Sequence, residues 1–125
     1  MATSGHTTSI DPESKLGYLE ITGRVSGKAR ETEIWFAADD RRIYLLSGGG
    51  IDKDWIRNFQ RTPRVRFRVG ATWVTGTARL VDDPDLELTT RKAVAAKYLD
   101  YDPARGDPLP AGWSRTAAPV VIDLD

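Results

Sequence analysis

Three short stretches of the sequence carry residue types suited to holding an anion or a planar ligand. In the first, residues 23–30, two glycines and Ser26 lie among Arg24, Lys28 and Arg30. Glycine lets the backbone approach a ligand closely, and guanidinium and ammonium groups bind phosphate or carboxylate oxygens. The spacing is not that of a Walker loop. The stretch predicts either an anion-binding loop or a solvated hairpin tip.

The second stretch is the run Ser47, Gly48, Gly49 and Gly50, which leads into a predicted helix. Glycines between a strand and a helix N-terminus expose backbone N–H groups at the positive end of the helix dipole. That geometry favours an anion or a planar ring rich in carbonyl groups. The alternative is a flexible strand-to-helix connection.

The third stretch is the predicted helix at residues 52–61, in which Trp55 and Asn58 lie three positions apart and share a face. Asn58 suits a hydrogen bond to a ligand or to a neighbouring loop, whereas Trp55 suits a ligand contact or the core. Farther along the chain, Tyr98, Tyr101 and Trp113 form an aromatic group. These rings would serve either as a lid over a flat substrate or as ordinary loop packing.

The composition excludes several kinds of chemistry. The 125 residues include no cysteine and one histidine, His6, so disulfides, thiolate nucleophiles, a serine–histidine–aspartate triad and metal sites are not expected. There are 18 basic and 18 acidic side chains, which gives no global reason to expect nucleic-acid binding. With neither a membrane-spanning run nor a secretory signal in view, we expect a cytoplasmic protein.

The elements that must position these residues follow from the apolar pattern. Arg64, Arg66 and Arg68 alternate with apolar residues, so the arginines line one strand face, as a polar outer surface, a subunit contact or, least favoured, a nucleic-acid contact. The consecutive Ile34, Trp35 and Phe36 predict a strand buried on both faces. Asp52 is the expected N-cap of the first helix, and a second helix is expected to open at Asp83 and Pro84. The expected strands are residues 16–22, 31–38, 42–47, 64–69, 72–81 and 119–124.

Strand and helix order therefore predicts a mainly β protein with two helices, built as a six-stranded antiparallel barrel or curled sheet. Residues 1–15 are expected to form a flexible N-terminal arm, and residues 16–125 a single domain. Residues 101–115, with three prolines and two glycines, are expected to be a long loop.

Five segments in this order resemble the deazaflavin-dependent nitroreductase and quinone reductase family, which has the split β-barrel fold of flavin-binding and pyridoxamine-phosphate-oxidase-like proteins. The segments are residues 22–30, 34–36, 44–50, 55–65 and 75–78. The resemblance implies binding of reduced coenzyme F-420, a deazaflavin with a phosphate and a polyglutamate tail. It also implies hydride transfer to an electron-poor quinone, nitro compound or enone, and a homodimer.

Carried over residue by residue, the resemblance assigns the anionic part of the cofactor to one loop and the ring to two later segments. The loop residues are Arg24, Ser26, Gly27, Lys28 and Arg30. The ring residues are Ser47, Gly48, Gly49, Trp55 and Asn58, with Lys53 as a weaker tail contact. Tyr98, Tyr101 or water would supply the proton that follows the hydride. FMN as the cofactor, and a non-catalytic deazaflavin carrier, remain the alternatives.

Overall fold

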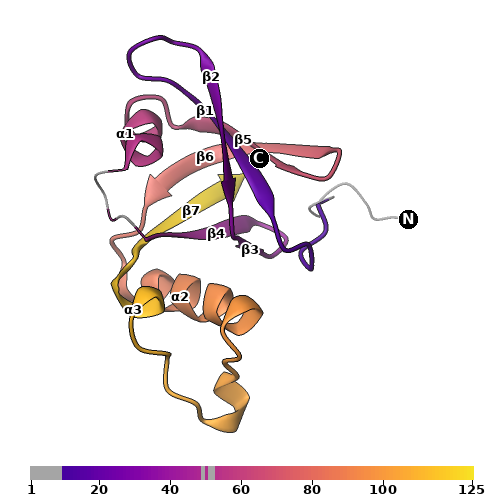
Figure 1. The fold of residues 1–125 in the computed structure, drawn as a ribbon, viewed down its shortest axis with the longest axis vertical. Coiled ribbons are helices and arrows are strands. Elements are labelled where there is room, and N and C mark those ends of the chain that lie inside the picture. Colours follow the sequence, from indigo (N-terminus) through magenta and orange to yellow (C-terminus); the bar gives the residue numbers. More distant parts are fainter. Residues whose placement is uncertain (1–9, 49, 51–52) are drawn as a thin grey trace.

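The computed structural model describes residues 10–48, 50 and 53–125 (Figure 1). Seven antiparallel strands form one curled sheet in the order β2-β1-β5-β6-β7-β4-β3. The strands are β1 (Gly17–Thr22), β2 (Ala29–Ile34), β3 (Ala37–Ala38), β4 (Arg42–Ser47), β5 (Arg64–Val69), β6 (Thr72–Leu80) and β7 (Ala118–Leu124). The predicted antiparallel split barrel is confirmed, with β2 and β3 at the two ends of the strand order.

Alternation of side chains decides which faces of the sheet are buried. In β5, Val65, Phe67 and Val69 are buried, while the arginines between them point away from the core, as predicted. In β4, by contrast, every residue from Ile43 to Ser47 is buried. A continuous apolar run of this kind is typical of a strand covered on both faces.

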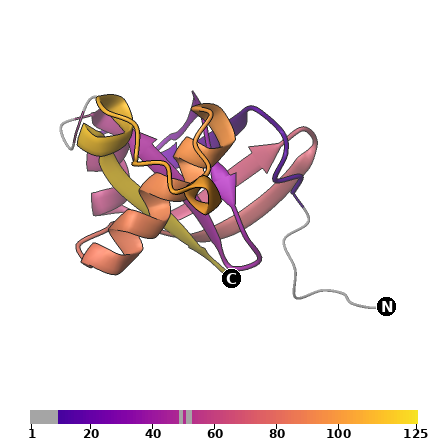
Figure 2. The same cartoon turned by 90° about the horizontal axis from the view of Figure 1, so that it is seen from below.

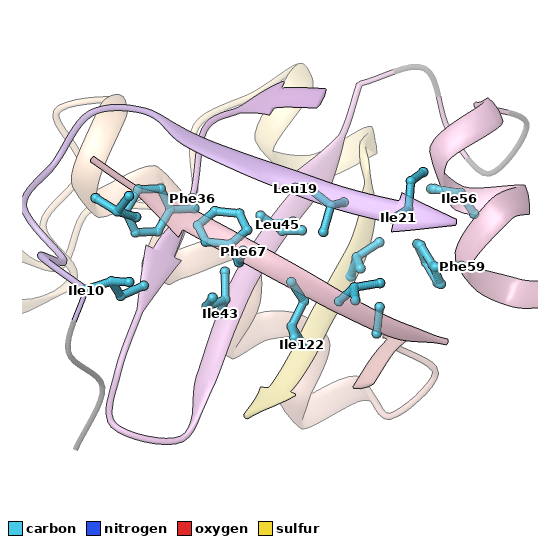
Figure 3. Close-up of a cluster of buried hydrophobic side chains, with 14 of the residues drawn as sticks. Ile10, Leu19, Ile21, Phe36, Ile43, Leu45, Ile56, Phe59, Phe67 and Ile122 are labelled. Atoms are coloured by element: carbon cyan, nitrogen blue, oxygen red, sulfur yellow. The ribbon is translucent and has the colours of Figure 1, made fainter. Parts of the chain in front are cut away.

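Two clusters cover those faces. The larger lies inside the curled sheet and contains Leu19, Phe36, Leu45 and Phe67, with Ile56 and Phe59 at one end of it (Figure 3). The smaller cluster lies on the other face of β4 and β7, around Tyr44, Leu46, Val94 and Val121. The larger cluster includes residues 56 and 59, and the smaller includes residue 94, so different helices pack against the two clusters.

Helix α1 (Asp54–Arg61) covers the end of the barrel beside the β1–β2 hairpin, and α2 (Pro84–Tyr98) packs across β3, β4 and β7 at the opposite end (Figures 1 and 2). Asp83 caps α2, because its side chain accepts a hydrogen bond from the Leu86 N–H at 3.1 Å. Two short helical segments follow α2: η3 (Pro103–Arg105) and α3 (Trp113–Thr116).

The structure corrects four local predictions. The strand expected at 31–38 is divided: β2 pairs with β1, and only β3 forms the expected hairpin with β4. Trp35, expected to be buried, is 44% exposed at the break between them. Asp52 lies outside the described residues, and the N-cap of α1 is Lys53. The loop expected at 101–115 contains η3 and the start of α3. The strand is divided because its two parts pair with different strands, β1 and β4, which a local pattern does not encode.

The arm predicted at residues 1–15 lies partly outside the described residues. Within its described end, Ile10 is 3% exposed and packs into the larger cluster (Figure 3). The Lys15 carbonyl lies 2.8 Å from the Tyr98 hydroxyl. The last part of this segment is therefore held against the domain.

Candidate functional site

Three aromatic rings stand beside the larger of two candidate cavities. Trp35 stacks on Tyr98 with ring centroids 4.4 Å apart and planes 2° from parallel. Trp113 meets Trp35 edge-on, at 5.7 Å and 86°. Together with apolar side chains, the two tryptophans line an open cavity of about 580 Å³; its described lining residues are Leu16, Glu33, Ile34, Trp35, Leu46, Leu99 and Trp113. Such a cavity suits a planar, mostly apolar ligand.

The glycine run begins beside this cavity. Ser47 is 2% exposed, and its hydroxyl donates to the Gly50 carbonyl at 2.9 Å, which folds the chain back after β4. A Cβ placed on Gly48 would lie 3.0 Å from the Trp113 indole nitrogen. Gly48 therefore lets the backbone pass close to an aromatic wall of the cavity. Gly49, the third residue predicted here, lies outside the described residues.

The two predicted proton donors lie in different surroundings. The Tyr98 hydroxyl accepts from the Phe36 N–H at 3.1 Å and lies 2.8 Å from the Lys15 carbonyl, so backbone groups occupy it. Burial raises the pKa of Tyr98, which disfavours the phenolate. Tyr101 is 6% exposed and is not among the described residues that line the cavity. Their role in proton transfer stays a prediction.

A second, smaller cleft of about 210 Å³ lies where the β1–β2 hairpin meets α1. Its described lining residues are Gly23, Arg24, Val25, Arg30, Asp54 and Asn58. Asn58 is 3% exposed, and its side-chain oxygen accepts from both the Arg24 N–H and the Arg24 guanidinium at 2.9 Å. Arg24 also lies 3.4 Å from Asp54. Asn58 thus fixes the hairpin to α1 and holds one arginine at the cleft.

The other residues predicted at this end are placed around the cleft. Ser26 accepts from the Lys28 N–H at 3.2 Å, and Gly27 has a φ of 72°, so both shape the tight hairpin turn. Lys28 and Lys53 are exposed. Trp55 packs toward Phe59, with centroids 5.9 Å apart, and belongs with the core rather than with the described lining of either cavity.

Edge strand β2 connects the two cavities. Arg30 near its start lines the cleft, and Ile34 at its end lines the aromatic cavity. Both residues pair with inward-facing positions of β1, since Arg30 is opposite Ile21 and Ile34 is opposite Gly17. Four strand residues span about 13 Å. A ligand that reaches both cavities would have to span about this distance.

The arginine-lined face lies on the outside of the sheet, with its charges matched within the chain. Arg64 contacts Asp125 at 2.6 Å, Arg66 contacts Glu20 at 3.2 Å and Arg68 contacts Glu31 at 3.3 Å. The Arg66 guanidinium also stacks 3.8 Å from the Trp73 ring centroid. Because these positive charges already have partners, the face is poorly suited to a phosphate backbone.

Sequence reasoning missed the importance of Trp35, Ile34 and Leu46 for the cavity. Trp35 falls at a strand break that the apolar run conceals, and Leu46 belongs to a strand that any pattern assigns to the core. Trp113 was included in the late aromatic group, but its contact with Trp35 joins distant parts of the chain. Successive residues of a strand point to opposite faces, so Leu45 and Leu46 must face different sides of β4. This alternation is the one sequence signal that Leu46 points away from the larger cluster.

Comparison with known families now places the chain. The model of the F420H(2)-dependent quinone reductase family matches residues 2–112, and the chain belongs to this family. It is therefore a reductase that depends on coenzyme F-420. No curated protein gives a significant match to the sequence.

Solved structures with similar folds agree with the split barrel. A conserved hypothetical protein from Mycobacterium tuberculosis matches with a TM-score of 0.70 and 20% identity, over 99% of this chain and 86% of that one. An F420-H2 dependent reductase matches with a TM-score of 0.65 and 18% identity, over 87% and 94%. A FAD-binding protein from Mesorhizobium loti matches with a TM-score of 0.60 and 18% identity, over 91% and 83%. At these identities the likeness concerns the fold.

The site has the features that this cofactor requires. The aromatic cavity lies within the range of about 300–1,000 Å³ usual for small-molecule sites, and its walls are mostly apolar, with Glu33 as a charged lining residue. Arg24 and Arg30 line the cleft, with Arg24 paired to Asn58 and Asp54, and the exposed Lys28 lies on the same hairpin. Within the described part of the chain, none of the helices has the length and apolarity to cross a bilayer.

Proposed function

We propose that this protein reduces an electron-poor acceptor, such as a quinone, a nitro compound or an enone, at the aromatic cavity. The observation that carries the proposal is that one edge strand, β2, contributes Ile34 to that cavity and Arg30 to the smaller cleft, four residues apart. When bound, reduced F-420 supplies a hydride from its ring carbon C5. The rest of the work belongs to the chain: holding the ring, placing the acceptor and limiting access of water.

The cationic end is proposed to hold the phosphate and the glutamate carboxylates. Arg30 and Lys28 are the principal contacts, because Arg24 is already engaged by Asn58 and Asp54. Ser26 and Gly27 set the hairpin that presents them, and Lys53 at the start of α1 adds a more distant charge. Charge-assisted hydrogen bonds of this kind give much of the affinity for an anionic tail.

The aromatic end is proposed to hold the ring and the acceptor. Ser47 and Gly48 shape the backbone beside Trp113, while Trp35 and Trp113 give flat walls that exclude water. Trp55 packs toward Phe59 and Asn58 binds Arg24, so these two residues contribute by holding α1 in place rather than by contact at the aromatic end. The reacting atoms must come within about 3–3.5 Å of each other, which rigid walls favour. Because backbone groups occupy the Tyr98 hydroxyl, we assign the following proton to water at the open mouth.

The proposed partner in assembly is a second copy of the chain. The outer face of β1, β5 and β6 presents Trp73, which is 37% exposed, beside the neutralised arginines. Aromatic residues and arginine are enriched at protein interfaces. Light scattering on the purified protein tests this: a mass twice 13.9 kDa is expected, and a monomer at micromolar concentration would overturn it.

The test of function is anaerobic turnover. Purified protein is mixed with chemically reduced F-420 and, separately, menadione, a nitroimidazole and cyclohexenone, and reoxidation of the cofactor is followed by absorbance. We expect turnover with at least one acceptor, and fluorescence titration at low ionic strength should give tighter binding of F-420 than of FMN. Binding without turnover over a broad acceptor panel would favour a carrier, and tighter FMN binding would overturn the cofactor assignment.

A further inference from the structure

Trp113 stands on α3, a helix of four residues that needs support from elsewhere. A single helical turn is not stable alone, and its last carbonyl groups have no partner within the helix. Ser114 is fully buried, and its hydroxyl donates to the Pro110 carbonyl at 2.7 Å on the side that leads into α3. The following residue after the helix, Ala117, is 3% exposed and leads into β7.

Arg91 supplies the support on the other side. This residue lies on the inner face of α2 and is 9% exposed. One guanidinium nitrogen, Nη1, donates to the carbonyls of Ser114 at 3.1 Å and Ala117 at 2.8 Å. The other two nitrogens contact Glu87, one turn earlier, at 3.0 Å and 2.9 Å. One buried side chain thus joins α2 to a carbonyl within α3 and to the carbonyl of its C-cap residue.

The position of α3 matters because it sets the indole of Trp113. That indole meets Trp35 edge-on at 5.7 Å on one side, and on another it closely approaches Gly48, where a Cβ would lie 3.0 Å away. The ring has little room to move toward the glycine run. If α3 were released from α2, the indole would lose its fixed position between Trp35 and Gly48, which would change the shape of the aromatic end.

We propose that Arg91 is a positioning residue that sets one aromatic wall of the cavity by fixing α3, and so acts through Trp113. The inference rests on the proposed function for its effect on ligand binding, but its effect on the two indoles is independent of any cofactor. The planar guanidinium is required because it directs donors to Glu87 and to α3 at once. A lysine ammonium has one nitrogen and cannot reproduce that fork.

The first test uses the protein without cofactor. Closely spaced indoles give coupled far-ultraviolet circular dichroism, and the Trp35–Trp113 signal is identified as the component lost in both Trp35→Phe and Trp113→Phe. We expect Arg91→Met to lose the same component, and Arg91→Lys to weaken it. The control is Arg79→Met on β6, which removes an ion pair of 2.8 Å with Asp123 on β7. This variant should leave the Trp35–Trp113 dichroism component unchanged.

The second test is a double-mutant cycle on F-420 affinity, measured by fluorescence. Arg91→Met is expected to weaken binding by about tenfold in the wild-type background, through loss of a preformed wall. In the Trp113→Ala background the same change is expected to have almost no further effect. An equal loss in both backgrounds, or an unchanged dichroism component in Arg91→Met, would overturn the proposal.

The role of Arg91 can be decided even if one variant does not fold or the cofactor does not bind. If Arg91→Met does not fold, Glu87→Gln and Arg91→Lys replace it, because each keeps most of the local packing. Both should weaken the indole component, and retention of it in both variants would overturn the proposal. If the wild-type protein does not bind F-420, the proposed function fails, while the dichroism experiment still decides the role of Arg91.

Discussion

The two ends of the candidate site depend on different physical interactions: apolar packing at one end and exposed charge at the other. The aromatic cavity is formed by side chains from β2, β4, α3 and the end of α2, and its walls depend on the packing of elements far apart in the sequence. The cationic cleft is formed by one hairpin and the helix beside it, and its principal groups are exposed charges. One end is specified by shape and burial, and the other by local charge.

That difference separates what each end should contribute to binding. Charge–charge contacts at exposed positions weaken as salt rises, since the screening length falls to about 8 Å at physiological ionic strength. Contacts with apolar walls do not weaken in this way. Ionic strength is therefore the variable that distinguishes the two ends, and variants at each end should respond to it differently.

The largest effect is expected at the cationic end. Replacing Lys28 and Arg30 together by alanine should weaken F-420 binding by about 2–4 kcal/mol at low ionic strength, taking charge-assisted contacts at roughly 1.5–3 kcal/mol each with imperfect additivity. The deficit should shrink at high salt. Fluorescence titration at two salt concentrations measures both effects.

The matched control for that prediction replaces two cations elsewhere by alanine: the exposed Arg41 in the β3–β4 turn and the half-buried Lys92 on α2. This pair changes the net charge by the same amount, so it should reproduce only the long-range part of the loss. If the Lys28 and Arg30 double variant binds as tightly as the wild type, the anionic tail lies elsewhere.

Replacing Asn58 by alanine should give the next largest effect, which is on the stability of the fold rather than on cofactor binding. Asn58→Ala removes the buried acceptor for two part-buried hydrogen bonds from Arg24. The expected loss is about 2 kcal/mol in the free energy of unfolding. Urea denaturation measures it, with Gln60→Ala as a control on the exposed side of the same helix. A loss no greater than the control's would mean that the hairpin is held by other contacts.

The contrast between the two ends also explains what could be predicted from the sequence. The hairpin with Arg24, Lys28 and Arg30 is contiguous, so residue types and spacing were sufficient to identify it. The alternation in β5 likewise decided its buried face. The aromatic cavity could not be predicted, because the contact between Trp35 and Trp113 depends on how α3 packs beside the break between β2 and β3.

The same limit applies to Tyr98 and Trp55. A sequence reveals that an aromatic residue is present, but not whether its polar tip is free. Here the Tyr98 hydroxyl meets backbone groups of Phe36 and Lys15, which belong to segments that no local pattern connects to α2. Trp55 lies on a helix face that would suit a ligand contact. In the structure its ring instead packs toward Phe59 on the same helix and against the larger core cluster.

Tyr98→Phe tests which role the aromatic end gives this tyrosine. The stacked ring is kept and the hydroxyl contacts are lost, so we expect about 1 kcal/mol less stability and a kcat for menadione reduction within about twofold of the wild type. Rapid-mixing kinetics and urea denaturation provide the two numbers. A fall in kcat of about 100-fold or more would instead identify Tyr98 as the general acid.

Lys97 gives the smallest effect and the sharpest contrast with the exposed cations of the cleft. Its ammonium lies 3.6 Å from the Phe36 ring centroid and, among the described residues, has no hydrogen-bond partner. Burial, with a smaller contribution from nearby Lys15, lowers the pKa of Lys97 to about 8. The lowered pKa means that burial disfavours the charged form by more than the nearby carboxylates of Glu13 and Asp11 favour it.

The sign of the pH dependence follows from proton counting. Above pH 8 the folded protein releases the Lys97 proton while the unfolded chain, with its pKa at 10.5, still holds it, so stability should rise with pH across that interval. Lys97→Met removes the buried charge and should raise the free energy of unfolding at pH 7 by about 0.5–1 kcal/mol, a value discounted for partial exposure. The advantage over wild type should shrink as the pH rises toward 9.5. Burial and the neighbouring Asp39 raise the pKa of Tyr44 to about 12. Both proteins contain Tyr44, so its ionisation cancels in the comparison.

Urea denaturation at several pH values measures the difference in stability between the two proteins. A methionine variant that is less stable than the wild type at pH 7 would show that the cation–aromatic contact outweighs the cost of burying the charge.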